Sequence, residues 1–390
     1  MKIVSFCHFL QGPAAMQYLG DMGAEVIRIE PPRGSYERHW AGAGARVGGV
    51  SSLYLCANRN ARSIAIDLKK PGAKEIVMAL IDKSHVVAEN FRPGTLDRLG
   101  LGFEDVRAQK PDIIYASASG FGATGPYAER PGQDLLIQAM SGIVAANGAG
   151  EHRPTAIGCA AADQHGAALF ALGIAGAYAR WLRTGEGTHV EASLLGAGID
   201  LQAESLVAYY ASEKGDEVFD RAEPLATWFH QAPYGIYRIA DGHIALSLNP
   251  VEKLGRALAT DVFERFVGVD PYEHRDAIAG TLAAKLTTRR FEELAAAFDA
   301  EQMWYARVDN FDDLANNPQV QHNEVFADVE VNGATARLVN HPNRYDGAVP
   351  PTRHFALQQG ADSREVLAEA GYGTGEIEQL LSDGVVHAPS

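Results

Sequence analysis

The fold is decided by residues 2–30, which read KIVSFCHFLQGPAAMQYLGDMGAEVIRIE. An apolar run over Ile3–Leu10 meets Gly12-Pro13, a segment with helical spacing continues to Met22, and Ala24–Glu30 alternates between apolar and polar residues. Alternation at every second position predicts a strand, and apolar residues three or four apart predict a helix. The stretch therefore predicts a β-α-β unit.

The same pattern continues outward from this unit. Strands are predicted at Ser63–Asp67, Val86–Glu89 and Ile113–Ser117, and a helix at Pro71–Lys83. Strands that alternate with helices predict a parallel sheet covered on both faces. We therefore expect the α/β class, with a large domain built on a Rossmann-like, doubly wound parallel sheet.

A long run of small and apolar residues covers Asp163–Thr184 and ends at Gly185. Arg180 and Arg183 lie in its last turns, where cations favour a helix end, and glycine is the residue that most often follows one. The run predicts a central helix of the large domain.

The pattern changes after Leu195 and indicates a second domain. Asp241-Gly242 and Asn332-Gly333 each lie between alternating segments and predict two hairpins. We expect residues 1–205 to form the first part of the large domain and residues 225–325 a smaller α+β domain. Residues 330–390 are expected to return to the large domain.

The C-terminal part also carries signals of helix ends. Asp362 and Glu365 have the spacing of a capping box, and Gly371 is placed to stop the helix that follows. We therefore expect a helix between Asp362 and Gly371.

Composition excludes several classes of protein. The chain has 390 residues, of which 46% are hydrophobic, and a net charge of −15, which disfavours a nucleic-acid partner. Cys7, Cys56 and Cys159 are too scattered for a disulfide framework or a zinc site. No segment has the pattern of a signal peptide or a membrane span. We expect a cytoplasmic protein without a metal, a membrane contact or a nucleic-acid partner.

One motif points to a different function and is misleading. Gly120–Gly125 matches the glycine pattern of dinucleotide-binding loops and follows a predicted strand. Such a loop must open a helix that holds the pyrophosphate, but Pro126 and Pro131 follow it here. The motif therefore does not support a nicotinamide cofactor.

Several segments together resemble the class III CoA-transferases, the family of formyl-CoA transferase, carnitine CoA-transferase and the α-methylacyl-CoA racemases. The resemblance covers most of the chain, and the order and spacing of the segments make it specific. The segments are QGPAAMQYLGDMGAEVIRIEP (residues 11–31), NARSIAIDL (60–68), VAENFRPGTLDRLG (87–100), SGFGATGPY (119–127), Asp134–Gly142, ADQHG (162–166) and RTGEG (183–187).

The resemblance implies that Asp163 is a nucleophile. Its carboxylate would attack a donor thioester to give a mixed anhydride, and the CoA thiolate would return to form an aspartyl-CoA thioester. Such covalent catalysis splits one hard displacement into easier steps. The start of a helix favours the ionised carboxylate that this needs. The alternative reading of Asp163 is an ordinary helix N-cap.

The resemblance also implies which residues contact CoA. Arg98 suits a phosphate, although it could merely pair with Asp97 or Glu104. Ile66 would be a wall for the adenine, although a strand isoleucine is usually core. His8 could equally be a buried histidine with satisfied hydrogen bonds. The residues at the family's CoA-contacting positions are His8, Ile66, Asn90, Phe91, Arg98 and Leu99. Two further arginines, Arg130 and Arg38, could bind a phosphate or a carboxylate.

Gln11 is the second candidate catalytic residue, because an amide can donate to a developing oxyanion. Formyl-CoA transferase has its glutamine three residues before the proline, whereas Gln11 lies two before it and Leu10 takes that place. The segment Phe229–Gly235 also lacks that enzyme's glycine-rich loop. Both departures weaken an oxalate-type interpretation.

Two other functions stay open. The family's racemases use a histidine as one of two bases, but Gln133 occupies the corresponding position, so a racemase would need another base such as His165 or His230. A non-catalytic CoA-binding protein with this fold is the third alternative.

The resemblance further implies the partners of the protein. We expect an acyl-CoA donor and a carboxylic acid acceptor, such as a small dicarboxylate, with CoA as a substrate and no permanently bound cofactor. Family members form ring-like, interlocked homodimers. The connections Glu213–Glu223 and Asn310–Phe326 could provide the path that interlocking needs.

Overall fold

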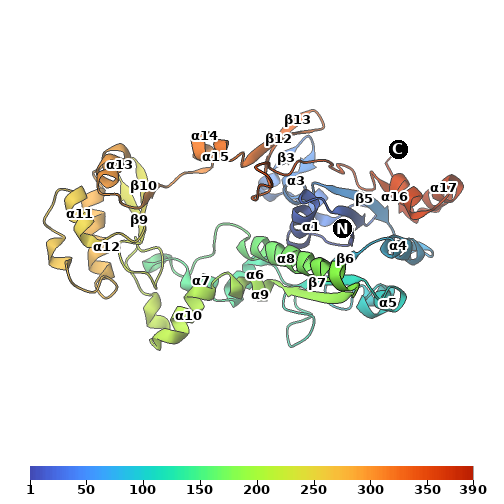
Figure 1. The fold of residues 1–390 in the computed structure, drawn as a ribbon, viewed down its shortest axis with the longest axis horizontal. Helices are drawn as coiled ribbons and strands as arrows, with labels where there is room; N and C mark the ends of the chain where they lie inside the picture. The colour runs from blue at the N-terminus through green and yellow to red at the C-terminus, as the bar shows by residue number, and fades with distance from the viewer. Residues whose placement is uncertain (390) are drawn as a thin grey trace. The chain divides into compact units, whose positions relative to one another are not determined.

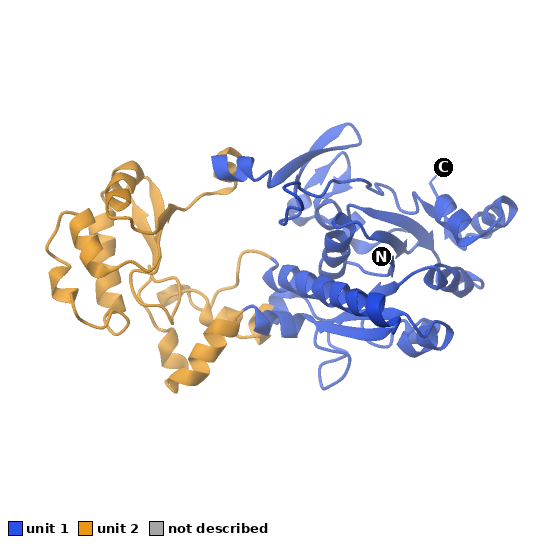
Figure 2. Cartoon of the chain, in the orientation of Figure 1, with its two compact units in different colours: residues 1–137, 160–201, 318–390 blue, residues 138–159, 202–317 orange. Residues whose placement is uncertain are grey.

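The computed structural model describes residues 1–389 and divides them into two compact units (Figure 2). The first unit contains residues 1–137, 160–201 and those from 318 onward, and the second contains residues 138–159 and 202–317. The expected domains had their boundaries at 205, 225, 325 and 330. They also assigned residues 138–159 to the large domain, whereas the structure groups this segment with the second unit.

A seven-stranded sheet forms the centre of the first unit (Figure 1). Its strands, in spatial order, are β14 (Val386–His387), β5 (Ala61–Ile66), β2 (Glu25–Glu30), β1 (Lys2–Ser5), β6 (Val86–Glu89), β7 (Ile114–Ser119) and β8 (Thr188–Ser193). All neighbours pair in parallel except β14, which runs antiparallel to β5. Without β14, the six parallel strands have the order 3-2-1-4-5-6 that Rossmann folds use.

Helices cover both faces of this sheet. Helices α1 (Gln11–Asp21) and α8 (Ala161–Thr184) pack on one face, with a core that includes Ile3. The other face packs α4 (Ala73–Asp82), α5 (Phe103–Gln109), α16 (Ser363–Ala370) and α17 (Thr374–Ser382) around a core that includes Val4. Successive strand residues thus enter opposite cores, as expected for a sheet that is buried on both faces.

The predicted central helix is α8. It ends at Gly185, whose φ of 69° is left-handed and whose N–H donates to the Trp181 carbonyl at 2.7 Å. Glycine adopts this conformation without steric cost, which explains why the helix ends there.

Shorter elements complete the first unit. They are α2 (Tyr36–His39), β3 (Arg46–Val47), β4 (Val50–Ser51), α3 (Ser52–Ala57), α9 (Leu194–Asp200), α15 (Pro318–His322), β12 (Phe326–Val331) and β13 (Ala334–Val339). The hairpin of β12 and β13 turns at Asn332 and Gly333, with φ of 49° and 80°. Two positive φ values are typical of the type I′ turn that Asn-Gly favours, so this prediction is confirmed.

The second unit has a three-stranded antiparallel sheet of β9 (Gly235–Ile239), β10 (Gly242–Leu246) and β11 (Tyr305–Arg307). Helices α11 (Val251–Ala257), α12 (Arg275–Leu286) and α13 (Phe291–Ala300) pack on it, and α10 (Ala203–Ser212) also belongs to this unit. The hairpin predicted at Asp241-Gly242 exists, but Gly242 already pairs with Ile239, so its loop is Ala240-Asp241.

The helix expected between Asp362 and Gly371 is α16, and Asp362 is its N-cap residue, so only the predicted capping box is wrong. The Asp362 side chain does not cap α16, because its Oδ2 accepts from the Ser63 N–H at 2.7 Å and lies 3.1 Å from His354 Nε2. The carboxylate therefore joins the C-terminal segment to β5 instead of closing a helix end. Gly371 does end α16, in the left-handed conformation.

No helix within residues 1–389 is long and apolar enough to cross a membrane.

Candidate active site

The strand order of the large sheet reverses between β1 and β6. In open α/β sheets, ligands bind outside the carboxyl ends of the strands at such a reversal. His8 follows β1 and Asn90 follows β6. The His8 N–H donates to Asn90 Oδ1, and Asn90 Nδ2 donates to the His8 carbonyl, both at 2.9 Å. The structure thus brings together two of the residues predicted to contact CoA.

The His8 ring continues this contact. It stacks on the ring of Phe91 with 4.8 Å between centroids, and its Nδ1 is buried without a hydrogen-bond partner among residues 1–389. Burial, assisted by the positive charge of Arg28, lowers the pKa of His8 to about 4. The imidazole is therefore neutral near pH 7. It can donate or accept a hydrogen bond with a ligand, but it cannot neutralise the charge of a phosphate.

Gln11 opens α1 and is only 4% exposed. Its Nε2 is buried without a hydrogen-bond partner in the described part of the chain. A Cβ added to Gly166 of α8 would lie 2.9 Å from this nitrogen. The Gln11 amide therefore lies against α8 one turn beyond Asp163, in the space that the glycine leaves.

Asp163 is the third residue of α8, which begins after Ala160. It is therefore not the N-cap, and the alternative reading of its position is wrong. Its N–H donates to Asp134 Oδ1 at 3.0 Å. Asp134 begins α6 (Asp134–Met140), and Ile137 of that helix packs in one apolar cluster with Ala162.

The electrostatics of Asp163 differ from the expectation. Burial, and after it the negative charge of Asp134, raises the pKa of the Asp163 carboxyl to about 7. A rise of this size corresponds to roughly 4 kcal/mol, whereas a helix N-terminus favours an anion by about 0.3–1 kcal/mol. Burial therefore outweighs the helix end, and the carboxyl is partly protonated near neutral pH.

Sequence reasoning missed Asp134 as a site residue. It lies inside a segment that carried the resemblance, but nothing in its local pattern indicates a contact with a helix that begins 27 positions later. Only the tertiary packing of α6 on the start of α8 reveals the pair.

The loop after β6 holds three more predicted residues. The Phe91 N–H donates to Glu89 Oε2 at 2.8 Å, and Leu99 packs against the core. Arg98 is exposed, donates to Thr95 Oγ1 at 3.2 Å and forms no ion pair within residues 1–389. The expected alternative, a pair with Asp97 or Glu104, is thus wrong, and the guanidinium is accessible to a phosphate.

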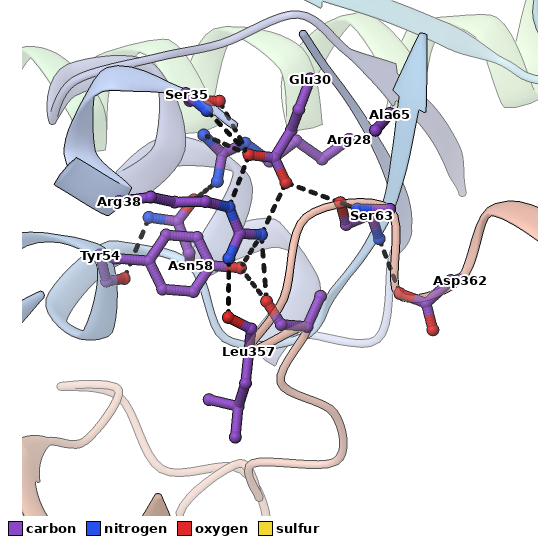
Figure 3. Close-up of polar contacts among 12 residues, drawn as sticks. Arg28, Glu30, Ser35, Arg38, Tyr54, Asn58, Ser63, Ala65, Leu357 and Asp362 are labelled. Atoms are coloured by element: carbon purple, nitrogen blue, oxygen red, sulfur yellow. Dashed lines mark hydrogen bonds and ion pairs between the residues drawn. The ribbon is translucent and has the colours of Figure 1, made fainter. Parts of the chain in front are cut away.

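Two predicted ligand residues are instead structural. Ile66 is 1% exposed, pairs with Val386 and belongs to the core, so it offers no surface to an adenine. Arg38 binds Glu30 through Nε at 2.7 Å and Nη2 at 2.6 Å and also donates to the Leu357 carbonyl (Figure 3). Its guanidinium is therefore committed and cannot recognise a phosphate.

Arg130 is exposed, and its guanidinium lies 4.1 Å from the centre of the Tyr127 ring. It lies in the segment between β7 and α6 that contains the glycine motif. That segment opens no helix before Asp134, as predicted for a motif that does not bind a dinucleotide.

A cavity of about 340 Å³ lies along one face of β7 and β8, beside the carboxyl end of β6 and the loop that follows it. Phe91 of the loop after β6 lines it, together with Glu89, Ser117 and His189. Burial raises the pKa of Glu89 to about 7, and Ser117 Oγ lies 3.1 Å from His189 Nε2. Glu89 and His189 were not singled out from the sequence, because their neighbourhood depends on the pairing of distant strands.

The two histidines considered as racemase bases have other contacts. His165 Nε2 lies 2.8 Å from Asp200 Oδ2 in the first unit. His230 Nδ1 lies 2.8 Å from Thr227 Oγ1 in the second unit. Residues 1–389 contain no group of three or more His, Cys, Asp or Glu side chains that could hold a metal ion.

Comparisons with known proteins give one consistent result. The sequence model of CoA-transferase family III matches residues 1–362. The acetyl-CoA:oxalate CoA-transferase of Acetobacter aceti is 33% identical over 289 residues, which are 73% of this chain and 72% of that protein. The succinyl-CoA:glutarate CoA-transferase of Mus musculus is 29% identical over 99% of this chain and 89% of its own length. A CaiB/BaiF family protein from Brucella suis has a similar structure, with a TM-score of 0.81 and 27% identity over 95% of this chain and 98% of its own.

Proposed function

The chain belongs to CoA-transferase family III, and on that premise we propose that it moves CoA from an acyl-CoA thioester to a free carboxylic acid through the Asp163 carboxylate. The observation that carries this proposal is the half-buried Asp163 at the start of α8, one turn from the amide of Gln11, whose Nε2 is buried without a hydrogen-bond partner among residues 1–389.

The first half of the reaction loads the enzyme. An Asp163 oxygen attacks the thioester carbonyl carbon, the C–S bond breaks, and CoA leaves as a thiolate, which gives a mixed anhydride. The thiolate then attacks the Asp163 carbonyl carbon of the anhydride and releases the donor as a free carboxylate. The product is an aspartyl-CoA thioester, and no net proton is taken up or released.

The second half reverses these steps with the acceptor. The acceptor carboxylate attacks the Asp163 carbonyl carbon, and CoA leaves as a thiolate. The thiolate then attacks the acceptor carbonyl carbon of the new anhydride, the C–O bond to Asp163 breaks, and the Asp163 carboxylate is released with acceptor-CoA. Each attack places negative charge on a carbonyl oxygen, and the Gln11 amide is a suitable donor to it. Small residues around the start of α8 leave space for the thioester.

CoA itself would be bound by the residues around the strand reversal. We propose contacts from His8, Asn90, Phe91 and Leu99. Arg98 and Arg130 are proposed to lie near phosphates, because both are exposed in the first unit. Ile66 is not part of this set.

We propose a small dicarboxylate as the acceptor. The relatives from A. aceti and M. musculus are CoA-transferases for oxalate and glutarate, and a succinate–glutarate CoA-transferase from Agrobacterium fabrum is 29% identical over 95% of this chain.

The test is an assay with succinyl-CoA and a panel of mono- and dicarboxylic acids, in which mass spectrometry follows new thioesters. Intact-protein mass should detect the aspartyl-CoA adduct in wild type and lose it in Asp163→Ala and Asp163→Asn. Wild type that forms acceptor-CoA while both variants do not supports the proposal. If no acid accepts CoA but deuterium from heavy water enters C2 of a 2-methylacyl-CoA, the protein is a racemase. Binding of CoA without either reaction would identify a non-catalytic CoA-binding protein.

We also propose a homodimer. Support comes from large apolar side chains that are exposed on the surface of each unit, such as Leu172 (67%) in the first and Tyr210 (75%) and Phe311 (92%) in the second. Light scattering after size exclusion should give twice the mass of the chain, and a monomer at micromolar concentration would contradict the proposal.

A further inference from the structure

Phe9 has an unusual backbone conformation. Its φ is 63°, in the left-handed region of backbone conformations that residues other than Gly, Asn and Asp rarely adopt. It lies between His8 and Gln11, in the turn that joins β1 to α1. Strain of this kind persists only where the surrounding structure over-determines it, and it clusters at functional sites.

The side chain of Glu37, in α2, binds the backbone of this turn. The Phe9 N–H donates to Glu37 Oε2 at 3.2 Å, and the Glu37 side chain is fully buried. The other carboxylate oxygen, Oε1, accepts from Arg28 Nη2, while Arg28 Nη1 donates to Asn58 Oδ1 at 2.6 Å. One carboxylate thus binds both a buried cation and the strained backbone.

Glu37 is the end of a row of buried charges, of which Figure 3 shows most. Arg38 forms two hydrogen bonds with Glu30, and Arg28 lies 3.9 Å from Glu30 and in contact with Glu37. All four side chains are less than a tenth exposed. Buried ions are costly unless each is paired, so these groups fix one another's positions.

Two further contacts hold the turn. Asn90, at the end of β6, binds both the N–H and the carbonyl of His8, and on the α2 side the Phe9 ring packs on Tyr36 with 4.7 Å between centroids. Residues 8–11 are therefore held between the end of β6 and α2.

We propose that Glu37 is a positioning residue of the active site, which holds Phe9 in its left-handed conformation and thereby places His8 and Gln11 for CoA. The choice of CoA as the ligand rests on the function proposed above. A competing role for Glu37 is that of a counterion for Arg28 and nothing more.

Substitution of Phe9 separates these two roles. Phe9→Gly removes the ring and the Cβ that makes a positive φ costly, whereas Phe9→Ala removes the ring and keeps the Cβ. The two variants therefore differ chiefly in whether the left-handed conformation at position 9 needs a contact to stabilise it. The loss of charge opposite Arg28 in Glu37→Gln is the same in both backgrounds.

The experiment combines Glu37→Gln with wild type, Phe9→Ala and Phe9→Gly. Titration calorimetry with CoA measures Kd, and the transfer assay measures kcat and KM. Glu37→Gln leaves one oxygen, for which the Arg28 guanidinium and the Phe9 N–H compete. We expect the variant to weaken CoA binding about tenfold in wild type and in Phe9→Ala, because the left-handed conformation is disfavoured there and is held less firmly. In Phe9→Gly the loss should be less than about threefold.

Equal losses in the Ala and Gly backgrounds, or no loss in wild type, would overturn the proposal in favour of the counterion role. If Glu37→Gln does not fold, Glu37→Asp keeps the charge but shortens the reach to Phe9, and the same comparison applies. The two proposals fail differently. Wild type that binds CoA without transferring it sinks the transferase function, while the background dependence of Kd still decides the role of Glu37.

Discussion

At Asp163, the fold opposes the charge that the proposed reaction needs. Burial and the charge of Asp134 raise the pKa of the carboxyl to about 7, so the folded protein favours the protonated form of Asp163. The contribution of Asp163 to the free energy of unfolding is therefore present at low pH and is lost as the pH rises through its pKa in the folded protein. In the proposed reaction the ionised form of Asp163 is the nucleophile, and ionising this carboxyl costs stability, as is common for catalytic groups.

The partner of Asp163 gives the first prediction at this scale. Asp134→Asn keeps an oxygen that can accept from the Asp163 N–H and removes one negative charge. The pKa of Asp163 should then fall, and the acid limb of kcat/KM should move down by roughly half to one pH unit, since burial is the larger cause and stays. A pH–rate profile measures this, with Asp134→Ala as the variant that also loses the hydrogen bond. An unchanged or upward-moving limb would contradict the role assigned to Asp134.

At the scale of the element, α8 depends on a glycine for its contact with α1. Gly166→Ala would place a Cβ 2.9 Å from Gln11 Nε2, and it would also crowd Leu194 and Ala197 at 3.4 Å. We expect kcat to fall about tenfold or more as the amide is displaced, with a smaller effect on the KM for CoA.

Gly176→Ala on the same helix is the matched control. Nothing lies within 4 Å of its added Cβ, so it should raise stability by up to about 1 kcal/mol through helix propensity and leave kcat unchanged. If both variants lose activity alike, the contact between Gly166 and Gln11 has no special role.

Much of the element pattern follows from local sequence. The first β-α-β unit, the strands at β5, β6 and β7, the helix α8 with its Gly185 stop and the Asn-Gly hairpin all carry strong periodic or turn signals. Strands β8 and β14 were not predicted. They form the two edges of the sheet, and β14 has only two residues, so pairing rather than periodicity defines them.

The site was predictable to a lesser degree. His8 and Asn90 lie close together because each follows the carboxyl end of one of two neighbouring parallel strands, β1 and β6. The Asp134–Asp163 pair and the contact between Phe9 and Glu37 depend on how helices pack, which no local pattern encodes. Arg38 and Ile66 were misassigned because a buried structural residue and a ligand residue look alike in sequence.

At the scale of the whole molecule, Arg38 links the N-terminal strands to the C-terminal segment. Besides Glu30, its guanidinium donates to Tyr54 Oη at 2.8 Å and to the carbonyls of Ala356 and Leu357 at 3.0 Å. Arg38→Lys cannot satisfy these acceptors with one nitrogen. The free energy of unfolding should fall by roughly 2–4 kcal/mol in denaturant titration. The Kd for CoA should change less than about twofold, because a lysine keeps the positive charge beside Glu30 and leaves the Arg28–Glu37 contact in place.

Arg98→Gln should affect CoA binding and not stability, the opposite of Arg38→Lys. It should leave the unfolding free energy unchanged and weaken CoA binding about tenfold, because Arg98 is exposed and proposed to face a phosphate. A drop in CoA affinity for Arg38→Lys without a drop in stability would restore Arg38 as a ligand residue.

The return of the C-terminal segment to the first unit has a consequence for biosynthesis. Strand β14 covers the edge of β5, and Val366 and Leu367 of α16 complete the core on one face of the sheet, yet the ribosome makes them after the whole second unit. At about 5–20 residues per second, several seconds pass between the synthesis of residue 318 and that of residue 387. During that time the nascent chain exposes an open sheet edge and an unfinished core, which is the kind of surface that chaperones bind. All residues of the second unit are synthesised before residue 318, so the first unit is the last part of this chain whose core becomes complete during translation.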